Sequence, residues 1–313
     1  MREIINLKPV LKETVWGGKR LEEYGLSLPS DHVGESWAIS THPNGDDVID
    51  GGIFNGLHLS QLWKDHRELF GNIEGECFPL LTKIIDAEQD LSIQVHPDDA
   101  YARVHENGSL GKMECWYVLD CAPDASIVIG HNAKTHEEVK YMIEERKWKD
   151  FIREIPIQKG DFFQIEPGTV HAIKGGTVIL ETQQNSDVTY RVYDYDRLSD
   201  GKLRDLHVQQ SIDVITAPYE AHDTVKDISA TQNSNMENLV SCSRYNVWHM
   251  NVSGTEEILQ DQPFMMVSIV NGGGAVDEMK VSKGKSFILP YGYGKVVFKG
   301  EMEAIISSVH VNK

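Results

Sequence analysis

Cysteine, long apolar runs and basic residues are all scarce in this sequence. Its 313 residues include four cysteines and no Cys-x-x-Cys pair, so we expect free thiols, as in a cytoplasmic protein, and no disulfide framework. No apolar run approaches the ~18 residues of a transmembrane helix, and the N-terminal residues have no apolar signal-peptide core. The sequence therefore predicts neither a membrane span nor a secretory signal.

The shortage of basic residues excludes two classes of partner. Lysine and arginine total 30 against 48 aspartates and glutamates, which gives a formal net charge of −18 at pH 7. A surface this acidic repels nucleic acid and anionic membranes, so we expect neither as a partner. An anionic small molecule can still bind where its site supplies local positive charge.

Nucleotide-binding signatures are absent as well. The sequence contains no Gly-x-Gly-x-x-Gly motif, no P-loop and no sustained alternation of helices and strands, so a nucleotide-binding α/β fold is not expected. Short strand patterns separated by glycine turns predominate instead. Helices are predicted at 60–70, 135–148 and 205–215. Thr135 precedes Glu138 by three residues, which is the spacing of a helix-capping box.

A polar segment at residues 222–238 divides the chain. We predict an N-terminal domain with helical insertions at 1–225, a linker at 226–238 and a C-terminal barrel at 239–313. Short strands punctuated by glycine turns favour a sandwich or barrel for the last part. These strands are expected at 245–252, 264–270, 286–289, 296–298 and 304–309.

The stretch at residues 91–98 has the pattern of a functional site. Alternate side chains of a strand share a face, so a strand here places Ser92, Gln94 and His96 on one face. Three polar groups on one face are more typical of a site than of a core.

Two later residues complement His96 chemically. Glu114 opens a predicted strand, and His171 follows a Pro-Gly turn. Three protein ligands drawn from histidine and carboxylate, with one open position, are typical of catalytic zinc. By spacing alone the indication is weak, because a single histidine is usually a surface or core residue and a strand-end carboxylate is usually solvated.

Four ordered motifs give the sequence a family resemblance. They are Gln94-Val95-His96-Pro97, Gly111-Lys112-Met113-Glu114, Pro167-Gly168-Thr169-Val170-His171-Ala172 and Asp187-Val188-Thr189-Tyr190-Arg191. Together they resemble the type I mannose-6-phosphate isomerases (phosphomannose isomerases) of the cupin superfamily, in their short bacterial branch. Trp16-Gly17 and Glu35-Ser36-Trp37 also fit. The resemblance covers most of residues 1–220 and implies a mainly β fold of two cupin-type jelly-roll β-barrels, with a few short helices inserted in the N-terminal half.

The resemblance also implies one Zn²⁺ per chain. Its ligands are expected to be His96, Glu114 and His171, and Gln94 matches a fourth ligand of the longer enzymes. A neutral amide oxygen is a weak zinc ligand, so contact with water or substrate is the alternative for Gln94.

The implied reaction interconverts mannose 6-phosphate and fructose 6-phosphate through a cis-enediol, with zinc as Lewis acid or template. Arg191 matches the catalytic arginine and can stabilise the enediolate. Lys112 is either the proton-transfer base or a charge clamp for the phosphate, and Asp187 is expected to orient Arg191 or share protons with it. Ser92 matches a phosphate-contacting position, and Trp16 is expected to contact the substrate.

The remaining expectations are simpler. Tyr193, Asp194 and Tyr195 are interpreted as packing residues. His249 and His310 have no carboxylate on the same strand face, so no second metal is expected in the C-terminal barrel. We expect a cytoplasmic enzyme, monomeric or homodimeric, whose partner is a small-molecule sugar phosphate.

Two other functions stay open. One is another cupin metalloenzyme, an oxygenase or decarboxylase, although these usually carry His-x-His where this chain has Gln94-x-His96. The other is a non-catalytic protein that binds a sugar phosphate. Metal analysis and an isomerase assay distinguish the three.

Overall fold

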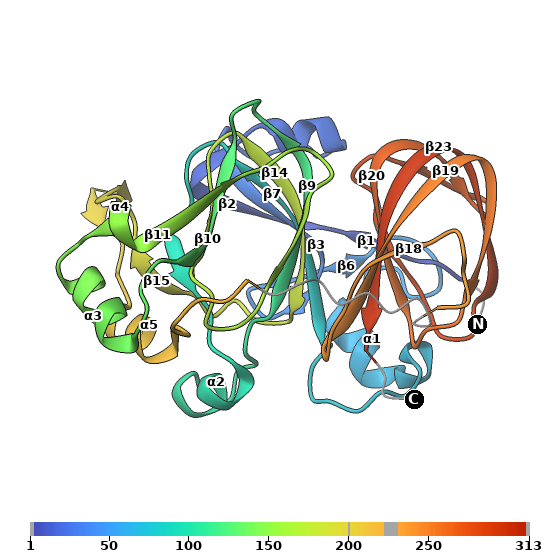
Figure 1. Cartoon of the computed structure of the whole chain (residues 1–313). Helices are drawn as coiled ribbons and strands as arrows, with labels where there is room; N and C mark the ends of the chain where they lie inside the picture. The colour runs from blue at the N-terminus through green and yellow to red at the C-terminus, as the bar shows by residue number, and fades with distance from the viewer. Residues whose placement is uncertain (1–2, 200, 222–230, 311–313) are drawn as a thin grey trace.

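The computed structural model describes residues 3–199, 201–221 and 231–310. Many of them lie in β-strands, which curve into two β-rich halves that lie side by side (Figure 1). Five α-helices occur in the described residues, all of them in the N-terminal part of the chain. The prediction of a mainly β fold with a few short helices is confirmed.

Two sheets form the N-terminal half. The first has the strand order β12 (Phe162–Ile165), β9 (Glu114–Cys121), β14 (Thr177–Gln184), β7 (Leu80–Ala87), β2 (Val10–Gly18) and β3 (Val33–Ile39). The second has the order β11 (Ile152–Pro156), β10 (Ser126–His131), β13 (His171–Ile173), β8 (Ile93–Val95) and β15 (Tyr190–Tyr193). Two small hairpins are β4 (Thr41–His42) with β5 (Gly45–Asp46), and β16 (Leu198–Ser199) with β17 (Lys202–Leu203).

One eight-stranded sheet forms the C-terminal half. Its order is β18 (Glu237–Ser241), β19 (Tyr245–Gln260), β23 (Gly294–Val309), β20 (Met265–Val276), β22 (Ser286–Leu289), β1 (Ile5–Lys8) and β6 (Val48–Ile49), with β21 (Met279–Ser282) paired to β20. β1 and β6 come from the start of the chain, so strand pairing crosses the predicted domain boundary. β18 begins inside the predicted linker, whose residues 226–230 lie outside the described part. The division into two domains stays a prediction.

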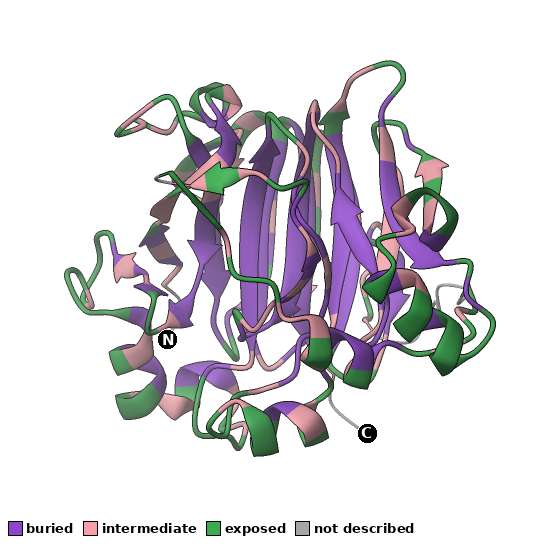
Figure 2. Cartoon of the chain, turned by 90° about the vertical axis from the view of Figure 1, so that its left-hand side faces the viewer, coloured by how far each residue is buried: buried purple, intermediate pink, exposed green. Residues whose placement is uncertain are grey.

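The helices are short and lie at the periphery of the sheets (Figure 2). They are α1 (Leu59–Asp65), α2 (Asp99–His105), α3 (His136–Glu144), α4 (Trp148–Phe151) and α5 (Val208–Val214), with 3₁₀ turns η1 (Arg20–Tyr24) and η2 (Arg67–Phe70). Thr135 caps α3 as predicted, since its hydroxyl oxygen accepts a hydrogen bond from the Glu138 backbone N–H at 3.2 Å.

Backbone conformation breaks two of the predicted helices. The helix expected at 60–70 divides into α1 and η2 at His66, whose φ of −132° and ψ of 54° are not helical. The helix expected at 135–148 ends before Arg146, which has a left-handed φ of 53°. The sequence reasoning missed α2, although Asp98 caps it by accepting a hydrogen bond from the Tyr101 N–H at 2.8 Å.

The strands predicted at 296–298 and 304–309 form one strand, β23. It pairs with the 16 residues of β19 without a register shift, and Gly300 lies opposite Gly254. A Cβ on Gly300 would lie 2.4 Å from the Gly273 carbonyl oxygen. The glycine therefore permits close approach of neighbouring strands instead of ending a strand.

The inner strands of the N-terminal half are largely buried, as Figure 2 shows from that side. The ends of β8, β9 and β13 meet between its two sheets, and the predicted site residues lie there. The four cysteines are free, as predicted. Among the described residues, no helix has the length and apolar character needed to cross a membrane.

Candidate active site

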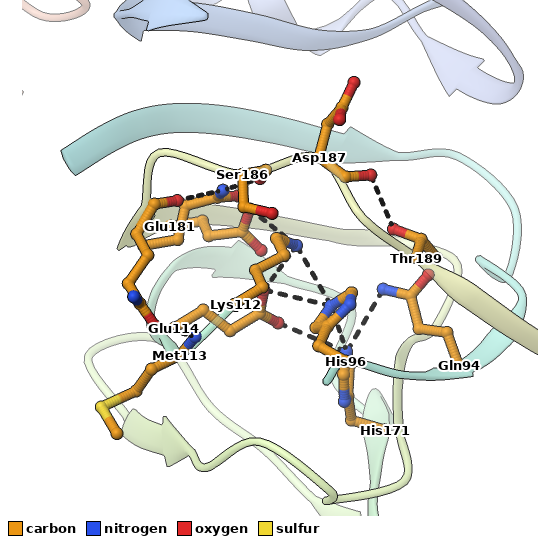
Figure 3. A network of polar contacts seen from close by, with 12 residues as sticks. Gln94, His96, Lys112, Met113, Glu114, His171, Glu181, Ser186, Asp187 and Thr189 are labelled. Carbon is orange, nitrogen blue, oxygen red and sulfur yellow. Dashed lines mark hydrogen bonds and ion pairs between the residues drawn. The ribbon is translucent and has the colours of Figure 1, made fainter. Parts of the chain in front are cut away.

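The three predicted metal ligands come together between the two N-terminal sheets. His96 follows β8, Glu114 begins β9 and His171 begins β13. Antiparallel pairing of β13 with β8 sets His171 opposite Gln94, and the Nε2 atoms of His171 and His96 are 3.1 Å apart. All three residues are buried, and their ligand atoms lie within 4.8 Å of one another (Figure 3).

Backbone carbonyl groups determine which ring nitrogen of each histidine carries the proton. The Nδ1 atoms of His96 and His171 lie 2.8 Å from the carbonyl oxygens of Val188 and Thr169, respectively. A carbonyl oxygen only accepts, so we assign the proton to Nδ1 and a lone pair to Nε2 in both rings. Two lone pairs 3.1 Å apart repel unless a cation or proton lies between them. Histidine ligands of metals are typically oriented in this way.

Glu114 adds a fully buried carboxylate to the two imidazoles. Its oxygens lie 3.3 Å from His96 Nε2, 3.4 Å from His171 Nε2 and 2.6 Å from Lys112 Nζ. Burial, followed by the charge of Lys112, lowers the pKa of His96 to about 3. Burial alone would raise the pKa of Glu114, but Lys112 and the two histidines hold it well below its usual value. Neutral imidazole and ionised carboxylate are the forms that bind metal.

Gln94 lies at the edge of this cluster. Its amide nitrogen is 3.2 Å from His171 Nε2, to which it donates. Rotating the amide by about 180° places its oxygen in the same position, because the two ends of the amide have nearly the same shape. Both of the roles foreseen for Gln94 are therefore compatible with its position, and ligation stays a prediction.

A cavity of about 180 Å³ opens beside the cluster. Five residues predicted to act on metal or substrate line it: Trp16, Ser92, Gln94, Lys112 and Arg191. Pairing of β15 with β8 sets Arg191 opposite Gln94, and Arg191 Nη1 donates to the Asp205 carbonyl oxygen at 2.9 Å. The second sheet thus places the guanidinium of Arg191 near the three predicted metal ligands.

Sequence reasoning missed three charged residues of the first sheet that line the same cavity. Lys83 on β7 lies opposite Glu181 on β14, and its Nζ is 3.6 Å from Glu181 Oε1 and 3.5 Å from Glu35 Oε2. The available signal was a single charge within an apolar strand, as in Leu-Leu-Thr-Lys-Ile-Ile and Val-Ile-Leu-Glu-Thr. Arg204, which also lines the cavity, gave no such signal.

Glu181 differs from Glu114 in the direction in which its pKa is shifted. Its Oε2 accepts a hydrogen bond from the Trp116 indole N–H at 2.9 Å, and Lys112 Nζ lies 3.9 Å from its Oε1. Burial, followed by the charge of Glu114, raises the pKa of Glu181. The two carboxyl groups therefore differ in their tendency to hold a proton, which is a common arrangement in sites that transfer protons.

Asp187 does not contact Arg191 within the described structure, contrary to the prediction. Its carboxylate accepts hydrogen bonds from Asn44 Nδ2 at 2.5 Å and from His42 Nε2 at 3.3 Å. The next residue in the chain, Val188, carries the carbonyl oxygen that orients His96. Asp187 therefore anchors the loop that positions His96, a predicted metal ligand.

Two other single-residue predictions are wrong. Asp194 is no mere packing residue: it is buried, and its Oδ1 lies 2.6 Å from nitrogens of both Arg197 and Arg204. His249 does have a carboxylate partner, since its Nε2 lies 2.9 Å from Glu303 Oε1. Both errors have the same cause, because these partners lie on other strands or loops and sequence spacing does not reveal them.

Two family models match this chain. Residues 4–114 match "Phosphomannose isomerase type I, catalytic domain", and residues 235–309 match "Mannose-6-phosphate isomerase, cupin domain". The first match ends at Glu114, so it includes His96 and Lys112. The second covers the C-terminal half from just before β18 to the end of β23.

Relatives of similar length match almost the whole chain. Mannose-6-phosphate isomerase ManA of Bacillus subtilis (strain 168) is 46% identical over 316 residues, which cover 97% of this chain and 98% of that protein. A mannose-6-phosphate isomerase of Streptococcus mutans is 45% identical over 313 residues, covering 98% of each. The crystal structure of the mannose 6-phosphate isomerase from Bacillus subtilis matches with a TM-score of 0.94 at 41% identity, over 98% of this chain and 99% of that chain. The chain therefore belongs to the type I mannose-6-phosphate isomerase family.

Proposed function

We propose that this chain is a zinc-dependent aldose–ketose isomerase that interconverts mannose 6-phosphate and fructose 6-phosphate through a cis-enediol. The observation that carries the zinc assignment is the meeting of two imidazole lone pairs and one ionised carboxylate in a buried site. These ligand atoms converge within 4.8 Å of one another, and two imidazoles with one carboxylate form a donor set typical of catalytic zinc. The family membership carries the reaction.

His96, His171 and Glu114 are the residues that would hold the metal, with Gln94 as a fourth donor after rotation of its amide. Zinc prefers this mixture of nitrogen and oxygen ligands, and when bound it supplies a Lewis acid for the oxygens at C1 and C2 of the open-chain sugar. The hydrogen bonds from the Nδ1 atoms of His96 and His171 to backbone carbonyl oxygens keep both imidazoles oriented for metal binding.

Arg191 stabilises the negative charge that develops on oxygen when the proton leaves C2. Its guanidinium is charged throughout the working pH range, and it lines the cavity beside Gln94. A fixed charge in a water-poor site stabilises such a transition state better than mobile water does.

Proton transfer between C2 and C1 needs a group that takes the proton and returns it. Lys112 and Glu181 both line the cavity and lie next to each other, with Lys112 Nζ 3.9 Å from Glu181 Oε1. The raised pKa of Glu181, caused mainly by burial, suits it to hold a proton during turnover. Asp187 acts as a positioning residue in this scheme because it does not line the cavity.

Metal analysis combined with a coupled assay tests the proposal. We expect purified protein to contain about one zinc per chain and to form fructose 6-phosphate from mannose 6-phosphate. Chelation should abolish the activity, and added zinc should restore it. Protein that holds no zinc and gives no product even after zinc is added would contradict the proposal. Zinc retention with sugar-phosphate binding but no turnover would favour the non-catalytic alternative.

A further inference from the structure

Arg197 and Arg204 both contact the buried carboxylate of Asp194, and Arg191 lies near them. Arg204 makes a two-pronged contact with it, Nε to Oδ2 at 2.7 Å and Nη2 to Oδ1 at 2.6 Å. Arg197 Nη2 donates to the same Oδ1 at 2.6 Å. Two-pronged pairs of this kind fix the plane of a guanidinium. Asp194 therefore determines where Arg204 presents its remaining donors.

Arg204 and Arg197 differ in what lies on their far side. Arg197 turns its other nitrogen, Nη1, to the Asp90 carbonyl oxygen at 2.8 Å and does not line the cavity. Arg204 does line the cavity, and its Nη1 makes no hydrogen bond within the described part of the chain. A guanidinium held on one edge and open on the other is suited to bind a second anion.

The charges around Arg204 are not balanced. Arg191, Arg197 and Arg204 bring three positive charges, against the carboxylates of Asp194 and the nearby Asp205. Burial, followed by the positive charge of Arg204, lowers the pKa of Arg191, which reflects their proximity. In a chain with a net charge of −18, this surplus of positive charge is local to the cavity. Local positive charge of this kind attracts an anionic substrate.

The two lysines of the cavity are both engaged by carboxylates. Lys83 Nζ lies between Glu35 and Glu181, at 3.5 and 3.6 Å. Lys112 Nζ lies 2.6 Å from Glu114. A phosphate dianion placed beside these lysines would face the three carboxylates that pair with them. It would also lie close to the three predicted metal ligands, where the reacting carbons of the sugar have to lie. Arg204 Nη1, by contrast, faces no carboxylate partner within the described part of the chain.

We propose that Arg204, held in place by Asp194, binds the phosphate group of the sugar phosphate and thereby sets which end of the sugar faces His96, Glu114 and His171. This inference rests on the proposed function. In this orientation C1 and C2 lie next to the three predicted metal ligands. C6 and its phosphate point toward Arg204 and Ser92, which line the same cavity. Lys112 is then free of the phosphate-clamp role and remains available for proton transfer.

The test compares Arg204→Gln with Arg146→Gln in the zinc-loaded enzyme. Both substitutions remove one positive charge, but Arg146 is 57% exposed and pairs with the exposed Asp196. We expect Arg204→Gln to raise KM for mannose 6-phosphate and the inhibition constant of inorganic phosphate by about 10- to 100-fold, with kcat changed less than about threefold. Arg146→Gln should leave all three values near those of the wild type. Zinc content and Tm are measured for each variant.

An unchanged KM and phosphate inhibition in Arg204→Gln would overturn the proposal, and so would a loss confined to kcat. If Arg204→Gln loses its fold, Arg204→Lys carries the test. A lysine already paired with Asp194 cannot supply the free Nη1, so we expect a raised KM, and a wild-type KM in this variant would overturn the proposal.

Calorimetry with inorganic phosphate separates this inference from the proposed reaction. If the protein binds phosphate through Arg204 but has no isomerase activity, the result would support the phosphate site and contradict the proposed isomerase reaction. Isomerase activity with phosphate binding that is independent of Arg204 would support the reaction and overturn the phosphate site.

Discussion

The interiors of the two halves of the molecule differ in how many ionisable side chains they bury. The N-terminal half buries many ionisable residues, and six of them at the candidate site are each at most 5% exposed: Lys83, His96, Lys112, Glu114, His171 and Glu181. The C-terminal half encloses a cluster of apolar side chains that includes Trp248, Phe287 and Phe298. Apolar burial stabilises a fold, whereas buried charge costs free energy unless it is paired. The C-terminal half thus has an apolar interior, whereas the N-terminal half combines apolar clusters of its own with the buried ionisable residues of the candidate site.

The distribution of histidines sharpens this contrast. In the N-terminal half, His171 directs a lone pair at His96 and Glu114, and none of its ring nitrogens is left in water. In the C-terminal half, His249 also has a carboxylate neighbour, Glu303, but that carboxylate accepts a further hydrogen bond from the hydroxyl of Tyr117. A histidine next to a carboxylate is thus not sufficient for a metal site, because convergent donor atoms are also needed.

The substitution with the largest expected effect is His171→Ala. The amide of Gln94 is too weak a donor to replace an imidazole, so the variant should lose zinc and lose at least about 10³-fold in kcat/KM together. His249→Ala is the matched control, and it should keep both. Metal content by elemental analysis and the coupled assay measure the two outcomes. Stoichiometric zinc in His171→Ala would show that the ligand set is wrong.

Arg191→Ala comes next. The variant should retain zinc, because Arg191 is not among the metal-binding residues, and should lose about 10²- to 10³-fold in kcat, because a preorganised charge is removed from the reacting oxygens. Steady-state kinetics at matched zinc content provides the measurement. A change confined to KM would move Arg191 from catalysis to substrate binding.

Local patterns explain how much of the fold could be predicted. Strands with alternating or continuous apolar residues and the Thr135 cap depend on neighbours in sequence, and the structure has them. The pairing of β1 with β22 and β6 depends on segments far apart in the chain, and no local pattern reports it. The left-handed backbone of Arg146 accompanies local hydrogen bonds from the Arg146 and Lys147 N–H groups to the carbonyls of Ile143 and Met142, and an arginine does not signal such a helix end in the sequence.

The site divides in the same way. His96, Glu114 and His171 could be found because each belongs to a motif of several residues. Lys83 and Glu181 are each marked in the sequence only as a single charge within an apolar strand, and their pairing could not be predicted because strand register alone sets them opposite each other. Arg204 acquires its position from a buried carboxylate, and Asp194 looks like an ordinary polar residue in the sequence.

A smaller effect is expected from shortening apolar side chains in either half. Ile269→Val in the C-terminal core should lower the free energy of unfolding by about 0.5–1.5 kcal/mol, because Ile269 is fully buried. Ile93→Val on β8, which is equally buried, should cost about the same. Only Ile93→Val should also lower kcat/KM, because it lies next to Gln94. Equal losses of kcat/KM in Ile93→Val and Ile269→Val would contradict the assignment of the active site to the N-terminal half.

The smallest effect concerns Asp187 and depends on pH. The hydrogen bond from His42 lowers the pKa of Asp187 from 3.8 to about 2, against the opposing effect of burial. A carboxyl group with a lowered pKa in the folded state contributes stability that is fully present above pH 3.8 and is lost as the pH falls toward 2. Because the side chain is 38% exposed, we expect the contribution to be below about 1 kcal/mol.

Urea unfolding of Asp187→Asn and wild type at pH 7 and pH 2.5 measures this contribution. The stability difference should be present at pH 7 and should shrink at pH 2.5, where the wild-type carboxyl is partly protonated. Asp196→Asn, which removes an exposed carboxylate paired with Arg146, controls for the loss of one charge. A difference that is independent of pH would mean that Asp187 does not stabilise the fold through its charge. Its anchoring of the loop that orients His96 would then depend on hydrogen bonding alone, which asparagine preserves in part.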